Sequence, residues 1–248
     1  MVRRYRAARR DRDLVVVQGF HALKHALRFG AELVEVIAAD PDELERLASD
    51  LAPDLSGSFG ERAAPVSEET IAAIVPQGLY TRVVALARRP RMDLGAILGD
   101  PRPAPVVLLE EPRNMGNMGA CVRVAAAGEA AGVLTVGSND PWSPEAVQAA
   151  AGLHFALPVA GVATLLDIVR QRRHSNRPLV AIDPKGEGLR PAELPPRSIL
   201  AFGTERHGLS PELLEHADLR LGIPMRAGVS SLNLATTVSA VLFAQRLG

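Results

Sequence analysis

The 248-residue chain has few of the features that staple a protein or anchor it in a membrane. A single cysteine, Cys121, excludes an intramolecular disulfide and fits a reducing compartment, so we expect a cytoplasmic protein. No apolar run approaches the roughly 18 residues of a membrane span, and the basic N-terminus lacks the apolar stretch of a secretory signal. Apart from His21 and His25, the histidines show no metal-ligand spacing with cysteines or carboxylates, so we predict no metal.

The chain also lacks net charge, because 28 lysines and arginines balance 28 acidic residues. Alone, this balance argues against a protein that coats nucleic acid by bulk electrostatics. The charges are unevenly spread, since residues 1–13 hold six arginines and two aspartates whereas residues 14–90 hold 7 basic and 11 acidic residues. Only Lys24 and Lys185 are lysines. Arginine suits phosphate recognition, although an arginine-rich genome produces the same bias.

The first 105 residues divide into three predicted parts. Residues 1–13 are expected to form a flexible basic arm, which either contacts RNA or is simply a frayed terminus. Residues 14–90 alternate β-branched apolar runs with helical patterns, which predicts a small α/β domain. Its strands are expected at 14–17, 33–38 and 81–87, and its helices at 21–29, 42–51 and 67–74. Residues 91–105 contain three prolines within five positions, which predicts a stiff, non-helical linker.

Residues 106–248 show apolar strands that regularly alternate with helices. Strands are predicted at 106–109, 133–136, 156–159, 179–182, 199–202 and 219–223, with helices at 119–130, 143–151, 162–173, 211–216 and 231–247. This alternation predicts an α/β domain with a mostly parallel sheet that helices cover on both faces. Because ligands bind at the carboxyl ends of parallel strands, the loops that follow the strands are the places to search for a site.

Three of these loops have unusual sequences. In the first, glycines precede a helix that carries Arg123; such a loop either binds an anion through free N–H groups or is merely a tight turn. The second holds Glu205 between Gly203 and Gly208. Glu205 is either a hydrogen-bond acceptor in a site or the partner of the next arginine in a surface salt bridge. The third ends at Asn233 in the first turn of an apolar helix, where a buried amide is either a structural bridge or a ligand contact.

Together, in this order, the three loops resemble the SpoU/TrmH family of RNA ribose 2′-O-methyltransferases, within the SPOUT superfamily. The family's three motifs are Asn-x-Gly-x-x-x-Arg, apolar-Gly-x-Glu-x-x-Gly, and Ile-Pro-Met followed by Ser-Leu-Asn. They match Asn117, Gly119, Arg123, Gly203, Glu205, Gly208, Ile223, Pro224, Met225, Ser231, Leu232 and Asn233. The resemblance covers about residues 104–248. A weaker resemblance, carried by residues 18–22 and 76–78, relates residues 14–90 to a small, ribosomal-protein-like RNA-binding domain.

This resemblance implies more than the spacing shows. It implies a C-terminal trefoil knot, S-adenosylmethionine (AdoMet) as cofactor, RNA as substrate with rRNA preferred to tRNA, and a homodimer that shares the site. Carried over by motif, the catalytic residues would be Arg123, Glu205, Ser231 and Asn233, and the cofactor-binding residues Gly203, Ile223 and Leu232. We expect Arg123 to hold the phosphate beside the ribose, because its high pKa disfavours a role as base. RNA contacts are expected at Arg113, Asn117, His207, Arg172 and Arg173.

Several alternatives stay open at this point. The arginines between residues 170 and 177 form either an RNA-facing edge or a solvated helix end. Trp142 either stacks on a flipped base or packs in the interior. Many family members carry Arg-Ala-Ser before a glycine where this chain has residues 148–152 as Gln-Ala-Ala-Ala-Gly, so one cation and one hydroxyl are missing. The competing functions are a tRNA 2′-O-methyltransferase and a non-catalytic RNA-binding or ribosome-assembly protein.

Overall fold

The computed structural model describes residues 1–76, 81–204 and 207–247. The chain divides into two compact units: residues 1–91 with 142–156, and residues 92–141 with 157–248. This division differs from the predicted one, because residues 142–156 group with the first unit and the second unit already begins at Met92. Within the described residues, no helix has the length and apolar character needed to cross a membrane.

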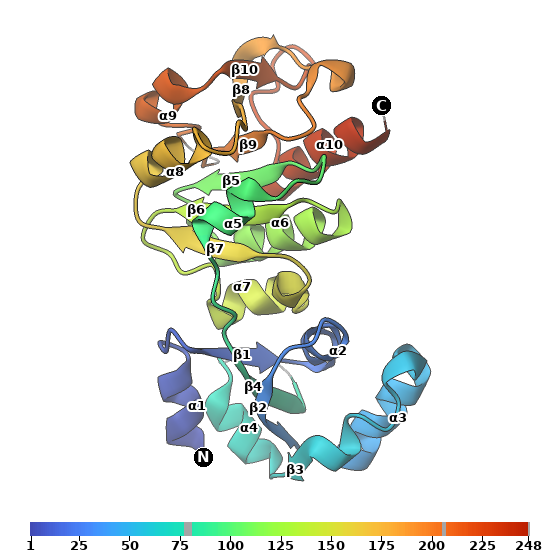
Figure 1. Ribbon diagram of the computed structural model, residues 1–248. Helices are drawn as coiled ribbons and strands as arrows, with labels where there is room; N and C mark the ends of the chain where they lie inside the picture. Colours follow the sequence, from blue (N-terminus) through green and yellow to red (C-terminus); the bar gives the residue numbers. More distant parts are fainter. Residues whose placement is uncertain (77–80, 205–206, 248) are drawn as a thin grey trace. The chain divides into compact units, whose positions relative to one another are not determined.

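The first unit is built on a four-stranded mixed sheet of order β1-β4-β2-β3 (Figure 1). Strand β4 pairs antiparallel with both β1 and β2, whereas β2 and β3 are parallel. The strands are β1 (Leu14–Gln18), β2 (Leu33–Ala38), β3 (Ala63–Pro65) and β4 (Val83–Arg88). The helices are α1 (Val2–Ala8), α2 (Phe20–Arg28), α3 (Pro41–Leu51), α4 (Glu68–Ile74) and α7 (Pro144–Ala149). Within residues 14–90, each predicted strand and helix has a counterpart, and β3 is a strand that was not predicted.

The predicted flexible arm is wrong, because residues 2–8 form the helix α1. Tyr5 and Ala8, spaced three residues apart, are buried in a core cluster with side chains of α4 and the sheet. Arg6 of the same helix donates a hydrogen bond to the carbonyl oxygen of Ala73 at 2.7 Å. The arginine-rich composition concealed a short amphipathic pattern with one apolar face and one cationic face.

Trp142 belongs to the first unit and packs inside it. Its ring is 3% exposed and lies 5.1 Å from the ring of His154 and 5.4 Å from that of Phe155, between centroids. The guanidinium of Arg89 lies 5.7 Å from the centre of the indole. These contacts favour the packing interpretation of Trp142 over stacking on an RNA base.

His25 on α2 makes the stability of the first unit depend on pH. Its Nδ1 lies 2.7 Å from the carbonyl oxygen of Ala151. Burial is the largest cause that lowers the pKa of His25 below 6.5, and the positive charges of Lys24 and Arg28 lower it further, against the opposing effect of the bond to Ala151. The unfolded chain therefore takes up the proton more readily than the folded one. This contribution to stability is fully present above the unfolded pKa of His25, and it is lost as the pH falls from that value through the lower pKa of the folded protein.

We expect His25→Gln to flatten this pH dependence. Between about pH 7.5 and about pH 5.5, the melting temperature should fall less in His25→Gln than in the wild type. His21→Gln is the matched control, because His21 is exposed on the same helix. Differential scanning calorimetry at both pH values measures the effect, and equal falls for the wild type and His25→Gln would contradict it.

The second unit is built on a six-stranded sheet of order β10-β8-β9-β5-β6-β7 (Figure 1). Every pairing in it is parallel. The strands are β5 (Val106–Glu110), β6 (Gly132–Val136), β7 (Val159–Val162), β8 (Leu179–Gly188), β9 (Ile199–Phe202) and β10 (Leu219–Gly222). All residues of β5 and β9 are buried, as expected for strands that are covered on both faces.

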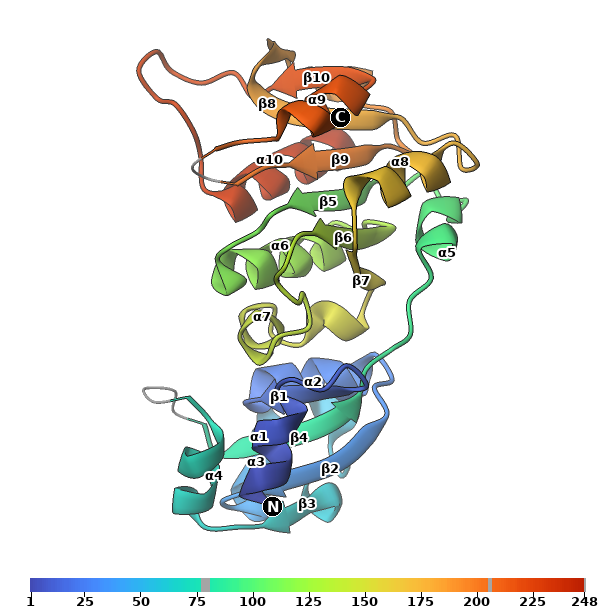
Figure 2. The ribbon, with the colours of Figure 1, turned by 90° about the vertical axis from the view of Figure 1, so that its left-hand side faces the viewer.

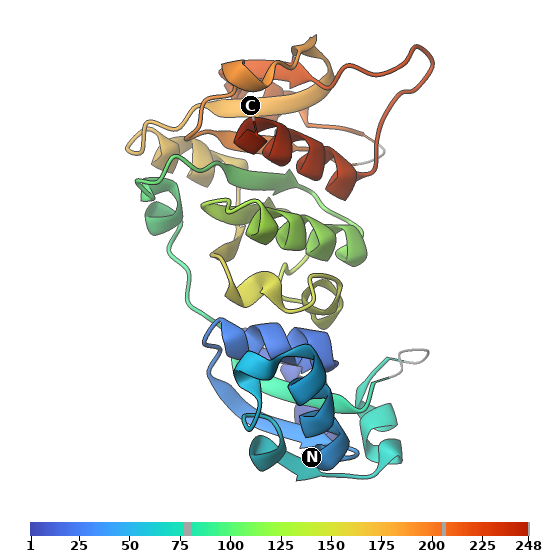
Figure 3. The same ribbon diagram turned by 90° about the vertical axis from the view of Figure 1, so that its right-hand side faces the viewer.

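Helices cover both faces of this sheet. Helices α6 (Met115–Ala127) and α10 (Leu234–Leu247) lie side by side on one face (Figure 3). Helices α5 (Leu94–Gly99), α8 (Leu165–Arg172) and α9 (Pro211–His216) lie on the other (Figure 2). The core on this second face joins Ile97, Ile168 and Leu213 from the helices to buried strand residues. The predicted fold class, a small α/β unit followed by a parallel α/β unit, is confirmed, while the trefoil knot stays a prediction.

The predicted non-helical linker is wrong in its first half, which contains α5. Asp93 begins this helix by accepting hydrogen bonds from the backbone N–H groups of Gly95 and Ala96. Ile97 and Leu98 are buried in the core of the second unit. The three prolines all follow the end of α5, so they break the chain only beyond residue 99.

Arg177 holds the end of α5 and the segment that follows it in place within the second unit. Its side chain is buried and donates hydrogen bonds to the carbonyl oxygens of Leu98, Asp100 and Ala104, each at 2.7 Å. Arg197 also donates to the carbonyl oxygen of Asp100, at 3.0 Å. Arg177 is thus a structural cation rather than part of an RNA-facing edge.

We expect Arg177→Met to lower the free energy of unfolding by about 3 kcal/mol, because it leaves two buried carbonyl groups without a donor. Those carbonyls belong to Leu98 and Ala104, whereas that of Asp100 keeps Arg197. Urea denaturation measures the loss. Arg173→Met, at a neighbouring exposed position, should change stability by less than about 0.5 kcal/mol. Equal stabilities of the two variants would show that the buried hydrogen bonds are dispensable.

Candidate functional site

The first motif lies on α6, which begins earlier than predicted. Asn114 begins the helix, and its side-chain oxygen accepts a hydrogen bond from the backbone N–H of Asn117 at 2.9 Å. Asn117 and Gly119 therefore lie inside the helix rather than in a loop before it. Because Asn114 already satisfies a donor of the first turn, the helix start is a capped turn rather than an open anion cradle. Arg123 is exposed further along α6 and makes no ion pair with another described residue.

The second motif forms a tight loop after β9. Thr204 and Gly208 exchange two backbone hydrogen bonds, at 3.1 Å and 2.9 Å. A Cβ atom at Gly203 would lie 2.1 Å from the carbonyl carbon of Gly208, so only glycine fits this crossing. His207 is exposed, and its backbone N–H donates to Oγ1 of Thr204. The predicted catalytic Glu205 lies outside the described residues.

The third motif spans the connection from β10 to α10, which Figure 3 shows as an extended segment. The predicted helix start at 231 is wrong, because Asn233 caps α10 and the helix begins at Leu234. The side-chain oxygen of Asn233 accepts from the backbone N–H groups of Ala235 and Thr236, at 2.9 Å and 3.4 Å. Asn233 is also exposed rather than buried as the sequence pattern predicts, since it stands just outside the helix.

Two of the motifs meet directly through their asparagines. The side-chain nitrogen of Asn233 donates a hydrogen bond to the side-chain oxygen of Asn117 at 3.2 Å. These residues are 116 positions apart in the sequence and lie at the starts of α10 and α6. Asn233 is therefore a structural bridge in this structure. Its hydrogen bond joins the start of α10 to the first turn of α6 at the carboxyl edge of the parallel sheet.

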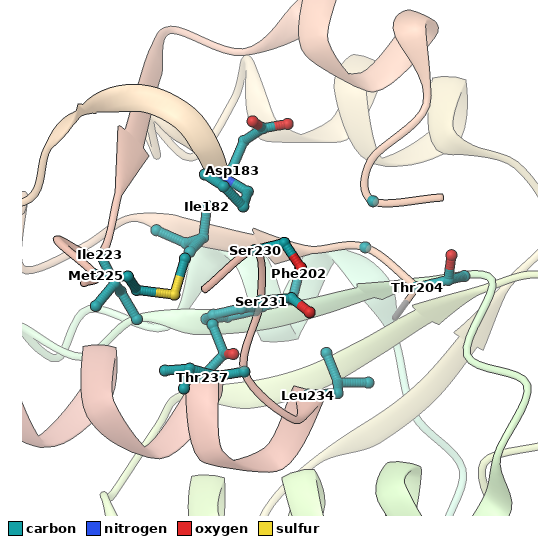
Figure 4. Close-up of a pocket in the computed structure, with 14 residues that line it drawn as sticks. Ile182, Asp183, Phe202, Thr204, Ile223, Met225, Ser230, Ser231, Leu234 and Thr237 are labelled. Atoms are coloured by element: carbon teal, nitrogen blue, oxygen red, sulfur yellow. The ribbon is translucent and has the colours of Figure 1, made fainter. Parts of the chain in front are cut away.

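A cavity of about 290 Å³ opens beside this edge, next to residues 182–184 in the middle of β8 and the carboxyl ends of β9 and β10 (Figure 4). All three predicted cofactor residues line it, namely Gly203, Ile223 and Leu232, together with Ser231. Arg123, Asn117 and Asn233 are not among the lining residues. The structure thus gathers the second and third motifs around one cavity and leaves Arg123 outside it.

Further lining residues, not expected from the sequence, come from β8, from β9 and the position after Gly203, and from α10. Among them are Ile182, Asp183, Phe202, Thr204 and Thr237. Asp183 is buried, and its side-chain oxygen accepts from the backbone N–H of Lys185 at 2.7 Å and from the Arg220 guanidinium at 3.1 Å. A carboxylate directly after a predicted parallel strand was a usable signal, but only the adjacency of β8, β9 and β10 gives it meaning.

The predicted RNA contacts fare differently. Arg113 and Arg173 are exposed. Arg172 is engaged in the fold, because it forms an ion pair with Asp218 and donates to the carbonyl oxygen of His216. The prediction that Arg172 faces RNA is therefore not favoured, because its guanidinium already has partners at the edge of the sheet. Throughout the described part of the chain, no three His, Cys, Asp or Glu side chains cluster as metal ligands.

The fold and the three motifs define a class of protein, and the comparison with known families identifies it. The sequence model of the SpoU rRNA Methylase family matches residues 104–243. The match covers more than half of the chain and includes all three motifs. The chain therefore belongs to the SpoU rRNA Methylase family.

Characterised relatives extend the similarity beyond this region. The 23S rRNA (uridine(2479)-2'-O)-methyltransferase of Streptomyces viridochromogenes is 29% identical over 206 residues, which cover 78% of this chain but only 64% of that protein. The 23S rRNA (guanosine-2'-O-)-methyltransferase RlmB of Haemophilus influenzae is 28% identical over 94% of this chain and 98% of its own length. The crystal structure of the AdoMet-bound rRNA methyltransferase from Sinorhizobium meliloti is 26% identical, covers 99% of this chain and 94% of its own, and superposes with a TM-score of 0.77.

Proposed function

We propose that the protein is an AdoMet-dependent 2′-O-methyltransferase of 23S ribosomal RNA. The observation that carries the proposal is the cavity at the carboxyl edge of the parallel sheet, where the second and third motifs converge on Gly203, Ile223, Ser231 and Leu232. The relatives similar over most of this chain support it, because their names specify 23S rRNA and the ribose 2′ oxygen. The S. meliloti relative, whose structure contains AdoMet, supports the choice of cofactor.

The cavity suits the chemistry of AdoMet. Apolar side chains of β8, of β9 and of the segment that follows β10 offer walls for a flat adenine ring. The hydroxyls of Thr204, Ser231 and Thr237 offer polar partners. The absence of a side chain at Gly203 keeps the backbone of the second motif close to this space. Gly203, Ile223 and Leu232 would hold the cofactor, with Ser231 at the side that faces the substrate.

When bound, AdoMet supplies a methyl group on a positively charged sulfur. The ribose 2′ oxygen attacks that methyl carbon, the carbon–sulfur bond breaks, and the hydroxyl proton must leave in or near the transition state. Arg123 would clamp the phosphate beside the ribose and stabilise the negative charge that develops on the 2′ oxygen. The exposure of Arg123 leaves its guanidinium available for this contact. Glu205 and Asn233 are proposed to orient the arginine and the ribose.

Ribosomal RNA is favoured over tRNA by the length of the similarity. RlmB matches 94% of this chain, so the similarity includes residues 14–90, the proposed RNA-binding domain. Arg113 and His207, which are exposed, and Asn117, which is half-buried, are proposed to contact the RNA near the cavity. The acidic excess of residues 14–90 predicts recognition through a limited patch and a shallow dependence of RNA binding on salt.

We further propose that the active form is a cytoplasmic homodimer whose site is completed across the interface. Leu232 is 38% exposed and Asn233 is exposed in the single chain, as expected for site residues that a second copy covers. The C-terminal segment between β10 and α10 is proposed to form the trefoil knot. Sedimentation equilibrium tests the dimer: a monomer at the concentrations at which the enzyme turns over would contradict it.

Isothermal titration calorimetry with AdoMet tests the proposed function against its non-catalytic alternative. We expect one binding site per chain with a dissociation constant in the micromolar range. This corresponds to a binding free energy on the order of −8 kcal/mol. An RNA-binding or ribosome-assembly protein that only shares the fold has no need of the cofactor. Absence of binding to folded protein would therefore favour that alternative.

A further inference from the structure

A buried carboxylate lies at the carboxyl end of the central strand β5, and the proposed reaction makes no use of it. Glu110 is 8% exposed and lies beside Val136 of β6. Both of its oxygens accept hydrogen bonds from Ser210, Oε2 from the backbone N–H at 2.7 Å and Oε1 from the hydroxyl at 2.6 Å. Removing a carboxylate from water costs several kcal/mol, so its burial here calls for a specific role.

Ser210 is the end of the loop that carries the second motif. Its hydroxyl oxygen also accepts a hydrogen bond from the backbone N–H of Leu213 at 3.1 Å. Ser210 therefore caps the start of α9. Two residues earlier, Gly208 pairs with Thr204 through two backbone hydrogen bonds. Because Gly203, Thr204 and Gly208 all line the cavity, the position of Ser210 fixes one wall of it.

We propose that Glu110 is a positioning residue that holds the β9–α9 loop (203–204 and 207–210 in the described residues) in the conformation that forms the cofactor cavity. Strand β9 fixes the first end of this loop, and β5, which pairs with β9, fixes the second end through the carboxylate. Glu110 itself does not line the cavity, so it acts through Ser210. The inference rests on the proposed function, since AdoMet is taken as the occupant.

Four variants separate this role from a general loss of stability. Glu110→Met removes both acceptors, whereas Glu110→Gln keeps a carbonyl oxygen for the Ser210 N–H and an amide for its hydroxyl. Ser210→Ala removes only the hydroxyl, and Ser210→Thr keeps it. Glu187→Met is the matched control, because Glu187 is exposed on β8. Melting temperatures establish that each variant is folded.

The experiment measures AdoMet affinity by calorimetry and the RNA KM by methyl transfer. We expect Glu110→Met to raise the dissociation constant of AdoMet at least about tenfold, with Ser210→Ala intermediate. Glu110→Gln, Ser210→Thr and Glu187→Met should stay within about threefold of the wild type, and the RNA KM should not change. Equal affinities for Glu110→Met and Glu187→Met would overturn the proposal, as would equal losses for Glu110→Met and Glu110→Gln.

Amide hydrogen exchange of the protein without cofactor gives a second, independent readout. We expect the amides of Thr204, Gly208 and Ser210 to exchange faster in Glu110→Met than in the wild type, while those of α6 do not change. Unchanged exchange in the loop would overturn the proposal. A wild-type protein that does not bind AdoMet would instead overturn the proposed function, and the exchange comparison would still decide whether Glu110 holds the loop.

Discussion

Gly203→Ala is expected to abolish AdoMet binding while leaving the protein folded. The new Cβ would lie 2.1 Å from the carbonyl carbon of Gly208 and 2.4 Å from the backbone nitrogen of Leu209. These are backbone atoms, so the overlap is relieved only when the loop that lines the cavity moves away. We expect the dissociation constant to rise on the order of 100-fold or more, equivalent to at least about 2.7 kcal/mol.

Gly188→Ala is the matched control for this prediction. Gly188 lies in β8 of the same unit, and a Cβ atom there meets nothing within 4 Å. Calorimetry with AdoMet should therefore give wild-type affinity for Gly188→Ala. Tight binding by Gly203→Ala would show that the backbone crossing of the second motif does not shape the cofactor site.

Arg123→Ala is expected to lower kcat about 100- to 1000-fold, the usual effect of removing one charge-stabilising group from a transition state. Arg123 is exposed and makes no ion pair among the described residues, so its removal should not destabilise the fold. It does not line the cavity, so the affinity for AdoMet should not change. Single-turnover methylation of RNA, with calorimetry alongside, measures both quantities.

Two further variants sharpen this prediction. Arg123→Lys keeps the charge but loses the fork that binds phosphate at two points, so its rate should lie between those of the wild type and Arg123→Ala. Arg190→Ala removes an exposed arginine that pairs with Glu193 and should leave the rate unchanged. Near-wild-type turnover by Arg123→Ala would show that another group stabilises the 2′ oxygen.

The sequence predicted the second unit well because its signals are local. Buried parallel strands appear as continuous apolar runs, and the three motifs each lie within a few residues of a strand end. Gly203, Ile223 and Leu232 were assigned to the cofactor through the resemblance of these loops to the family's motifs, and all three line the same cavity. The start of α10 was misplaced because serine and asparagine serve equally as caps, and only the hydrogen bonds of Asn233 distinguish them.

The remaining features depend on contacts between distant segments. Glu110 and Glu111 appear in the sequence as an acidic pair, and only the pairing of β5 with β6 and β9 shows that Glu110 is buried. Arg172 and Arg177 stand among exposed arginines, yet their guanidinium groups bond Asp218 and three carbonyl oxygens respectively. Tertiary partners decide whether a charge is part of the fold or of the surface, and a single sequence does not reveal them.

The zero net charge of the chain is compatible with an RNA substrate. An enzyme that must release a methylated RNA needs cations at the site rather than a basic surface. Several arginines bond to other groups within the protein, including Arg6, Arg172 and Arg177. Arg113, in the loop after β5, and Arg123, on α6, are exposed, and we propose that they contact the RNA.

Methyl transfer to ribosomal RNA tests the central claim most directly. Purified protein is incubated with AdoMet and with unmodified 23S rRNA, 16S rRNA or total tRNA, and 2′-O-methyl marks are mapped along each RNA. The account predicts one new ribose mark in 23S rRNA with the wild type, and its loss with both Gly203→Ala and Arg123→Ala. A mark confined to tRNA would contradict the substrate, and the absence of any ribose mark from protein that binds AdoMet would contradict the activity itself.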